Sequence, residues 1–244
     1  MNFIGRPLYI LMFCALALTR SGNATVFTPQ SDSLLTQWQQ VANGHLDLTD
    51  SAKVSLLTRI GESIQFHSPD SALTFYEIAY PIAREQGMER QIGDLLNMRG
   101  YVHYILGNYD LALSYFVDAL AIQEKLNNLI GISKSLNYIG LIYETQKNYS
   151  QALLYQWRSI VYSKKSGDTT RLIANYYNIS IVHDANGVPD SALYYLDMAQ
   201  DLSEARSNHH MYSMAMNRRG DVMFDLGRYD EAERLYRQVL NYPY

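Results

Sequence analysis

Asparagines recur at a fixed interval in this 244-residue chain. Asn97 and Asn137 are forty residues apart and Asn217 follows eighty residues later, with Tyr177 at the place between them. A side-chain amide can donate and accept hydrogen bonds together, so a row of amides suits the backbone of an extended peptide. The alternative interpretation is structural, with the same amides satisfying polar groups on an adjacent helix.

Other residues with chemical potential form no catalytic pattern. The sequence has no glycine-rich phosphate loop, no HExxH motif and no nucleophile elbow. His103 and His183 are separated by two intervals of forty, which favours interface residues over metal ligands. The adjacent His209 and His210 are a weak metal signal, and DANGVPD (184–190) has its glycine misplaced for a calcium loop. We therefore predict no catalytic residue, no metal site, no cofactor and no enzymatic activity.

The composition is typical of a soluble globular protein. Hydrophobic residues make up 48% of the chain and charged residues 18%, and the net charge is −4. This charge is mild, and no basic run with interleaved aromatic residues is present, so we predict no nucleic-acid partner.

The elements that must position these residues follow an internal repeat. GNYDLALSYF at 107–116 returns as KNYSQALLYQ at 147–156 and as GRYDEAERLY at 227–236. A spacing of forty aligns small residues at two places and large residues at a third. The alanines are Ala72, Ala112, Ala152, Ala192 and Ala232; twelve residues earlier stand Gly100, Gly140, Ser180 and Gly220; four residues later stand Tyr76, Phe116, Gln156, Leu196 and Tyr236. The constant interval indicates a structural unit.

Each unit is predicted to contain two helices. Apolar residues at helical spacing run through 95–107, and Gly107 then ends the helix in the left-handed conformation. Gly187 and Gly227 occupy the matching place, whereas Lys147 departs from the pattern. The second helix begins at caps or at first-turn prolines, namely Asn108, Asn148, Pro69 and Pro189.

The small residues predict a close approach of the two helices. We expect Gly100 and Ala112 to face each other across the helix pair, which lets the two backbones approach, and Phe116 to insert toward the neighbouring pair. The alanine is then fixed by steric clearance, while the surface positions are free to vary.

At this point the pattern resembles the tetratricopeptide repeat. The best match is Leu136, Ile139, Gly140, Tyr143 and Ala152, whereas His103 replaces the usual tyrosine one unit earlier. The interval of forty resembles the long-helix variant found in kinesin light chains and bacterial peptide-sensing regulators. The resemblance implies an all-α fold, an α-solenoid of antiparallel helix pairs with about five repeats.

The same resemblance implies a binding surface. In this family the first helices of the pairs build a concave wall, and asparagines on it hold a ligand's backbone. Carried onto this chain, the wall residues are Asn97, Tyr101, Tyr104, Asn137, Leu141, Glu144, Tyr177, Ile181, Asp184, Asn217, Asp221 and Phe224. The implied partner is a protein or an extended peptide, and the acidic side chains favour one with some positive charge.

The domain organisation follows from the interval. We predict a signal peptide over 1–24, an N-terminal segment over 25–50 with a capping helix at 29–43, and a repeat array over 51–244. The predicted units are 51–88, 90–128, 130–168, 170–208 and 210–244, the last of them incomplete. In the first unit Gly61 is out of step by one residue, as is common in terminal repeats.

The N-terminus has the pattern of an export signal. An apolar run from Pro7 to Leu18 is followed by Gly22 and Ala24 in the relation that signal peptidase prefers. The run is shorter than the ~20 residues that span a bilayer, which makes an uncleaved anchor the less favoured alternative. The single cysteine, Cys14, follows Phe13 rather than the small residue of a lipoprotein signal. We expect an exported protein, periplasmic or secreted.

The last predicted unit leaves the face around Tyr236 and Val239 without a following cap. Either a partner covers this face or the natural chain continues beyond Tyr244. The first alternative predicts an exported binding scaffold. The second predicts the extracytoplasmic sensor portion of a membrane-bound histidine kinase or helix-turn-helix regulator, with a membrane-attached output domain after residue 244.

Overall fold

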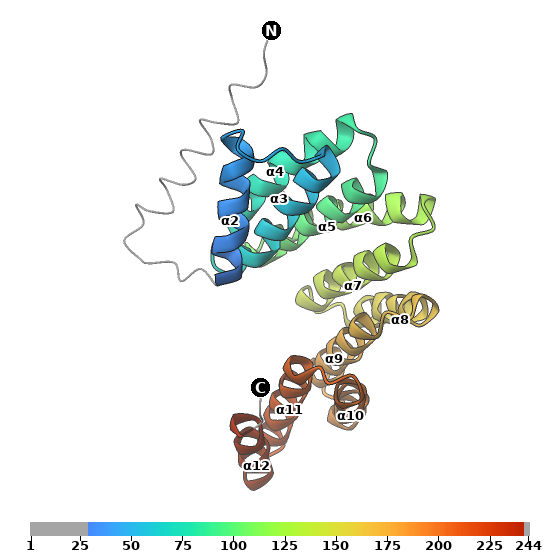
Figure 1. Ribbon diagram of the computed structural model, residues 1–244. Coiled ribbons are helices and arrows are strands. Elements are labelled where there is room, and N and C mark those ends of the chain that lie inside the picture. The colour runs from blue at the N-terminus through green and yellow to red at the C-terminus, as the bar shows by residue number, and fades with distance from the viewer. Residues whose placement is uncertain (1–28, 242–244) are drawn as a thin grey trace. The chain divides into compact units, whose positions relative to one another are not determined.

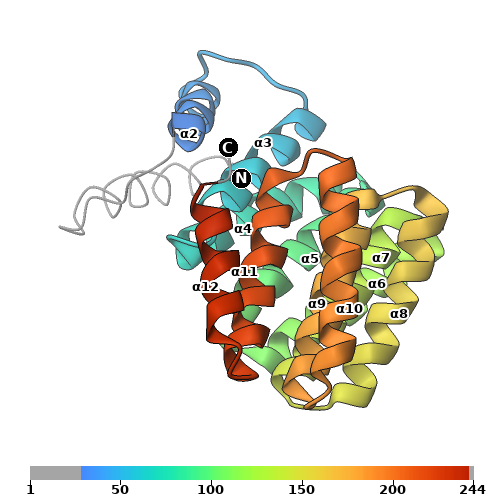
Figure 2. The ribbon, with the colours of Figure 1, turned by 90° about the horizontal axis from the view of Figure 1, so that it is seen from below.

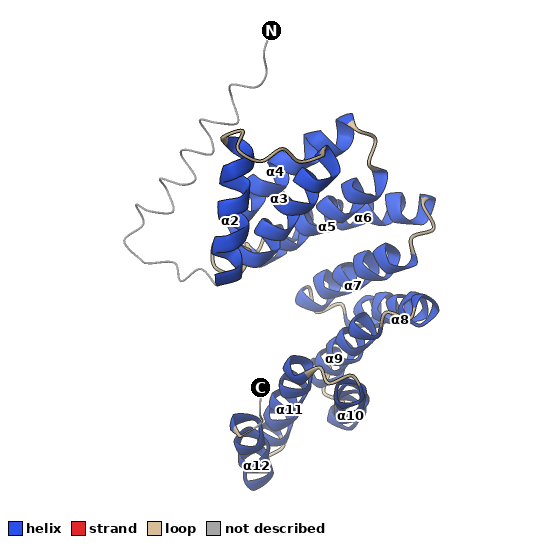
Figure 3. Cartoon of the chain, viewed as in Figure 1, coloured by secondary structure: helices blue, strands red, loops and turns tan. Residues whose placement is uncertain are grey.

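The described part of the chain consists of helices joined by short turns. The computed structural model describes residues 29–241, and within this range it contains no strand (Figure 3). The predicted signal peptide lies outside the described residues. The helices are α2 (Pro29–Ala42), α3 (Asp50–Ile64), α4 (Pro69–Glu85), α5 (Glu89–Ile105), α6 (Tyr109–Lys125), α7 (Leu129–Thr145), α8 (Tyr149–Ser166), α9 (Thr169–Ala185), α10 (Pro189–Ala205), α11 (His209–Asp225) and α12 (Tyr229–Leu240).

The turn within the four pairs from α5–α6 to α11–α12 is set by one residue in the left-handed conformation. Gly107, Gly187 and Gly227 have φ values of 77°, 74° and 73°. Lys147, which departs from the glycine pattern, adopts the same conformation with φ of 57°. Packing of the pair therefore imposes the turn on a residue that does not favour it.

Three of the predicted signals at helix starts are confirmed. Pro69 and Pro189 are the first residues of α4 and α10, where a missing amide proton leaves no hydrogen bond unmade. The side chain of Asn148 accepts a hydrogen bond from the backbone amide of Gln151 at 3.3 Å and so caps α8.

The chain forms two compact units, Met1–Ile122 and Gln123–Tyr244, with the boundary inside α6. In the first unit α2 packs on α3, α3 on α4 and α4 on α5, and α3 also contacts α5. In the second unit each helix from α7 to α12 packs on the next, and α9 also contacts α7 and α11 (Figures 1 and 2). Contacts between successive pairs and between their first helices are those of an α-solenoid, which confirms the predicted fold class.

Glycines in the first helices make room for large residues in the second helices. A Cβ added to Gly100 would lie 2.7 Å from the Phe116 ring, and one added to Gly220 would lie 2.5 Å from the Tyr236 ring. Phe116 thus packs on the glycine of its own pair. Gly61, one residue out of step, still lies against Tyr76.

The core of the second unit consists of aliphatic residues and alanines from successive helices. Ile160, Ile173, Ile179 and Leu196 are at most 2% exposed, and Ala192 and Ala199 lie between them. Alanine at these places keeps α9 and α10 close together. Within this unit the first helices α7, α9 and α11 contact one another in sequence, so their outer faces adjoin.

Candidate functional site on the first helices

The predicted wall residues lie on the first helices of four pairs, α5, α7, α9 and α11. Those on α5 belong to the first unit, and those on α7, α9 and α11 belong to the second. Within the second unit these three helices contact one another in sequence, so their residues share one face.

Two of the three predicted asparagines are buried. Asn97 is 0% exposed and Asn137 is 2% exposed. The Asn137 amide donates to the Gln156 side-chain oxygen at 2.9 Å and to the Asn175 side-chain oxygen at 2.8 Å. The Gln156 amide in turn donates to the Asn137 backbone carbonyl at 3.2 Å. Asn137 therefore fits the structural interpretation of these asparagines. Its amide does not face solvent and instead links α7 to α8 and α9.

This asparagine is part of a larger buried polar network. The Ser159 hydroxyl donates to the Ser133 carbonyl at 2.8 Å, and the Asn175 amide donates to the Ser163 hydroxyl at 3.3 Å. The hydroxyls of Ser133 and Ser163 are 2.6 Å apart. Gly140 leaves the space in which Gln156 lies, at a place where three of the other four repeats have an aromatic residue. Buried amides and hydroxyls are stable only when partnered in this way.

Polar residues from four helices, α7, α9, α11 and α12, lie around Arg218. The Arg218 guanidinium, on α11, forms an ion pair with Asp184 of α9. Its other terminal nitrogen lies 3.7 Å from the Asp221 carboxylate, which also accepts a hydrogen bond from the Tyr236 hydroxyl at 2.8 Å. Glu144 of α7 is close enough for Arg218 to affect its pKa. Glu144, Asp184 and Asp221 were predicted from sequence, whereas Arg218 was not.

The electrostatics of this Arg218 cluster are set by partial burial. Burial raises the pKa of Glu144 above its usual value, and the nearby Arg218 charge acts in the opposite direction. Burial also raises the pKa of Tyr177, with Arg218 lowering it and Asp221 raising it. Burial, and then the hydrogen bond to Asp221, raises the pKa of Tyr236 to about 12. Two carboxylates therefore pair with one arginine, and a third, that of Glu144, lies within its electrostatic influence in a partly buried place.

The C-terminal end of this face is more open. Asn217 is exposed, unlike Asn97 and Asn137. Phe224 is 56% exposed, and its ring meets that of Tyr229 edge-on with 5.1 Å between centroids. Leu141 and Ile181 are partly exposed on α7 and α9. The second unit thus offers a polar cluster beside an exposed amide and an exposed aromatic ring.

In the first unit the predicted residues belong to a chain of aromatic rings. Tyr101 and Tyr104 of α5 stack with centroids 5.9 Å apart. Phe66 approaches Tyr101 edge-on at 6.0 Å, and Tyr109 lies 5.8 Å from Tyr104. Sequence reasoning did not single out Phe66 or Tyr109. The repeat contained a signal for the latter, since Tyr104 and Tyr109 recur as Phe224 and Tyr229 three intervals later.

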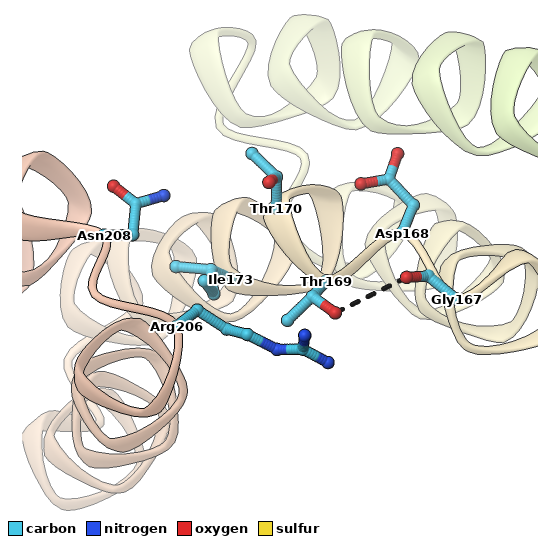
Figure 4. Close-up of a pocket in the computed structure, with 7 residues that line it drawn as sticks. All are labelled: Gly167, Asp168, Thr169, Thr170, Ile173, Arg206 and Asn208. Atoms are coloured by element: carbon cyan, nitrogen blue, oxygen red, sulfur yellow. Dashed lines mark hydrogen bonds between the residues drawn. The ribbon is translucent and has the colours of Figure 1, made fainter.

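A separate cavity of about 410 Å³ opens beside the turn between α8 and α9. Arg206 extends across this cavity toward Thr169, whose hydroxyl donates to the Gly167 carbonyl at 3.4 Å (Figure 4). Two other polar side chains that line the cavity cap helices. Asp168 accepts a hydrogen bond from the Arg171 backbone amide at the start of α9, and Asn208 accepts one from the Met211 backbone amide at the start of α11. None of the predicted wall residues lines this cavity.

Within residues 29–241 no group of three or more His, Asp, Glu or Cys side chains is arranged to hold a metal ion. Over the same part of the chain, no helix has both the length and the apolar character needed to cross a bilayer.

Comparisons with known structures support the fold. A Rap protein complexed with Competence and Sporulation Factor has a TM-score of 0.73 and 15% identity over 95% of this chain. The Rap conjugation gene regulator of plasmid pLS20, in complex with the Phr* peptide, has a TM-score of 0.69 and 16% identity over 98% of this chain. The chain covers 64% of each of these two proteins. A kinesin light chain with nearly identical repeats from Podosopora anserina has a TM-score of 0.59 and 14% sequence identity. The match covers 79% of this chain and 95% of the kinesin light chain.

At the level of sequence, no curated protein matches the chain. The family profile of the tetratricopeptide repeat, however, matches residues 91–160 and 171–242, which together make up more than half of the 244 residues. With the repeat interval, the helix pairs and the glycine contacts, this match shows that the chain belongs to the tetratricopeptide-repeat family.

Proposed function

We propose that this protein is a non-enzymatic scaffold that binds a protein segment or an extended peptide. The surface that carries the proposal is the face of α7, α9 and α11 in the second unit. Its main support is the Arg218 cluster, where carboxylates from three helices converge beside the exposed Asn217 and Phe224. The Rap regulator of pLS20, which has the same fold, is in complex with a peptide.

The ligand is inferred to carry a Lys or Arg side chain. Glu144, Asp184 and Asp221 contribute three negative charges and Arg218 one positive charge, which leaves a formal net charge of −2. A cation placed beside partly buried carboxylates is attracted more strongly than it would be in bulk water. Because Asn97 and Asn137 are buried, the proposed contacts to the ligand backbone rest on Asn217 and on the ring of Phe224.

Binding can be tested with fluorescent ten-residue peptides that differ only at one central position. Peptides with Arg or Lys there should bind more tightly than those with Glu, and raised salt should weaken the binding. The double variant Asn217→Ala with Phe224→Ala should weaken binding about tenfold or more, which corresponds to about 1.4 kcal/mol. Val117→Ala, at a similarly exposed place on α6, is the matched control. Equal binding of the Arg and Glu peptides would contradict the proposed charge preference.

We propose that the scaffold acts outside the cytoplasm. The apolar run from Pro7 to Leu18, followed by Gly22 and Ala24, supports this location. Expression of the whole gene with mass spectrometry of the exported product tests it, since cleavage should leave Thr25 as the first residue. Full-length protein recovered in the cytoplasm would contradict the proposal.

A second candidate function is the sensor portion of a receptor. The likeness to a conjugation gene regulator and to the repeat sensor of a signal-transduction ATPase from Pyrococcus horikoshii favours it. The discriminating observation is the coding sequence after Tyr244. An apolar run of ~20 residues there would support the receptor, whereas a stop codon would leave the free scaffold.

A further inference from the structure

The second helices of the repeats differ sharply at their outward-facing positions. These positions lie two, five and nine residues after the repeated alanine. In α8 all three are large and apolar, namely Leu154, Trp157 and Val161. In α10 they are Tyr194, Asp197 and Asp201, and in α12 the first two are Arg234 and Arg237. Solvent-facing positions should vary toward polar residues, so the apolar set in α8 requires a separate explanation.

The α8 residues form a continuous exposed stripe. Leu154 is 49% exposed, Trp157 42% and Val161 48%. Their spacing of three and four residues places them on one side of the helix over about 10 Å of its length. The stripe continues onto α10, where Trp157 meets Tyr195 edge-on at 5.8 Å and Tyr194, 59% exposed, meets Tyr195 at 5.1 Å. Figure 2 shows α8 and α10 next to each other.

Positive charge lies on α8 itself, at Arg158 and at the C-terminal end of the stripe. Helix α8 carries Arg158, Lys164 and Lys165 and no acidic residue, so its formal charge is +3. Each of the other described helices is neutral or negative by the same count, and α10, with four acidic residues and no basic one, has −4. Lys164 and Lys165 are exposed, while Arg158 reaches Glu124 only at 3.9 Å.

We propose that Leu154, Trp157, Val161 and Tyr194, called here the α8 patch, bind an acidic amphipathic helix of a partner protein. A helix is the occupant that matches a straight stripe of residues at spacings of three and four, because its own apolar ridge packs between those residues. Acidic residues beside that ridge would face Lys164 and Lys165. A membrane surface fits less well, because a broad anionic surface would also cover the four acidic residues of adjacent α10, whereas a single helix lying along α8 can place its acidic residues beside Lys164 and Lys165.

The α8 patch is a different surface from the face of the first helices. Tyr195 is not part of the patch but contacts its residue Trp157. Tyr195 also stacks with His183 and Tyr176 of α9, so it lies between the patch and the first helix of the pair. A partner on α8 and a peptide on α11 would thus contact different residues, and each can be tested while the other is left unchanged.

The probe is an 18-residue labelled peptide with leucines at helical spacing and glutamates elsewhere. Its controls are a scrambled peptide of the same composition and a version with lysine in place of glutamate. Binding to the full chain is followed by anisotropy. In a Trp38→Phe background, Trp157 is the remaining tryptophan, and its emission should shift to the blue as the peptide covers it.

The acidic amphipathic peptide should bind at least about tenfold more tightly than either control peptide. The double variants Leu154→Ser with Val161→Ser, and Lys164→Glu with Lys165→Glu, should each reduce its affinity by a similar factor. Phe224→Ser, an equally exposed change on α11, should leave it unchanged. All of these positions are exposed, so melting temperatures should stay close to the parent value.

Three results would overturn the proposal. One is binding that does not depend on the amphipathic pattern or on α8. It would be seen as equal binding of the acidic and scrambled peptides, or as loss of binding in Phe224→Ser and not in the α8 variants. Another is stripe-dependent binding to phosphatidylglycerol vesicles in place of the peptide, which would assign the α8 patch to a membrane. The third is a dimer mass in light scattering that the Leu154→Ser, Val161→Ser variant abolishes, which would assign the patch to a second copy of this chain.

Discussion

At the scale of single residues, the repeat uses one stacked ring pair at three places and in two versions, histidine on tyrosine and tyrosine on tyrosine. His103 stacks on Tyr115 with centroids 5.5 Å apart, Tyr143 on Tyr155 at 5.3 Å and His183 on Tyr195 at 5.4 Å. Histidine and tyrosine thus share one packing role. They differ in charge, because only histidine gains a proton in mildly acidic solution.

The histidine pairs should make the fold sensitive to acid. Burial lowers the pKa of His183, and burial together with the Arg99 charge lowers that of His103, with Glu77 opposing. Below the unfolded value of about 6.5 the unfolded chain binds more protons than the folded chain, so the free energy of unfolding decreases as pH falls. The double variant His103→Tyr with His183→Tyr keeps the stacks and should lose less stability between pH 7.5 and 5.5. The same pH slope in parent and variant would exclude this role.

The asparagine row separates into a structural and an exposed member. Asn137→Ala removes an amide that serves Gln156 and Asn175, so we expect a loss of about 1–3 kcal/mol in the free energy of unfolding. Asn217→Ala, at an exposed position, should change it by less than about 0.5 kcal/mol. Urea denaturation of both variants tests this difference. Equal stability of the two variants would mean that the buried network contributes nothing.

At the scale of the helix pair, each glycine is matched to one large side chain. Gly100→Ala should be destabilising by about 1–3 kcal/mol, because its Cβ would lie 2.7 Å from the Phe116 ring. The fourth repeat has Ser180 and the smaller Leu196 at the corresponding positions. Gly100→Ala combined with Phe116→Leu should therefore cost less than the sum of the single changes. Strict additivity in chemical denaturation would show that the two positions are not coupled.

The helix boundaries were predictable because their causes are local. Pro69, Pro189 and Asn148 act through their own backbone or through an amide three residues away. Lys147 shows the limit of such reasoning, since it takes the left-handed turn that the neighbouring repeats assign to glycine. There the packing of α7 on α8 outweighs the preference of one residue.

At the scale of the whole molecule, the two tryptophans report on different units. Trp38 lies in α2 of the first unit and Trp157 in α8 of the second. In a repeat protein each repeat contacts mainly its neighbours, so a local defect lowers stability locally. Ala152→Leu overpacks a fully buried site in the second unit. In single-tryptophan variants, it should lower the denaturation midpoint reported by Trp157 more than that reported by Trp38. Equal shifts would show that the chain unfolds as one cooperative unit.

The sequence by itself determined the repeat, the helix pairs and the family, because small residues, caps and turn residues recur at an interval of forty and act over short distances. Only the tertiary structure decided which polar residues face solvent. Asn137 and Asn217 occupy the same place in the repeat, yet Gln156 and Asn175 enclose the first and nothing similar encloses the second among the described residues.

The Arg218 cluster and the α8 patch also required the tertiary structure. Arg218 meets Asp184 across 34 residues of sequence, and Trp157 meets Tyr195 across 38. Helical periodicity gives the angle of a residue around its own helix. Which neighbour that angle faces depends on how the helices pack, and this is fixed by contacts between residues far apart in the chain.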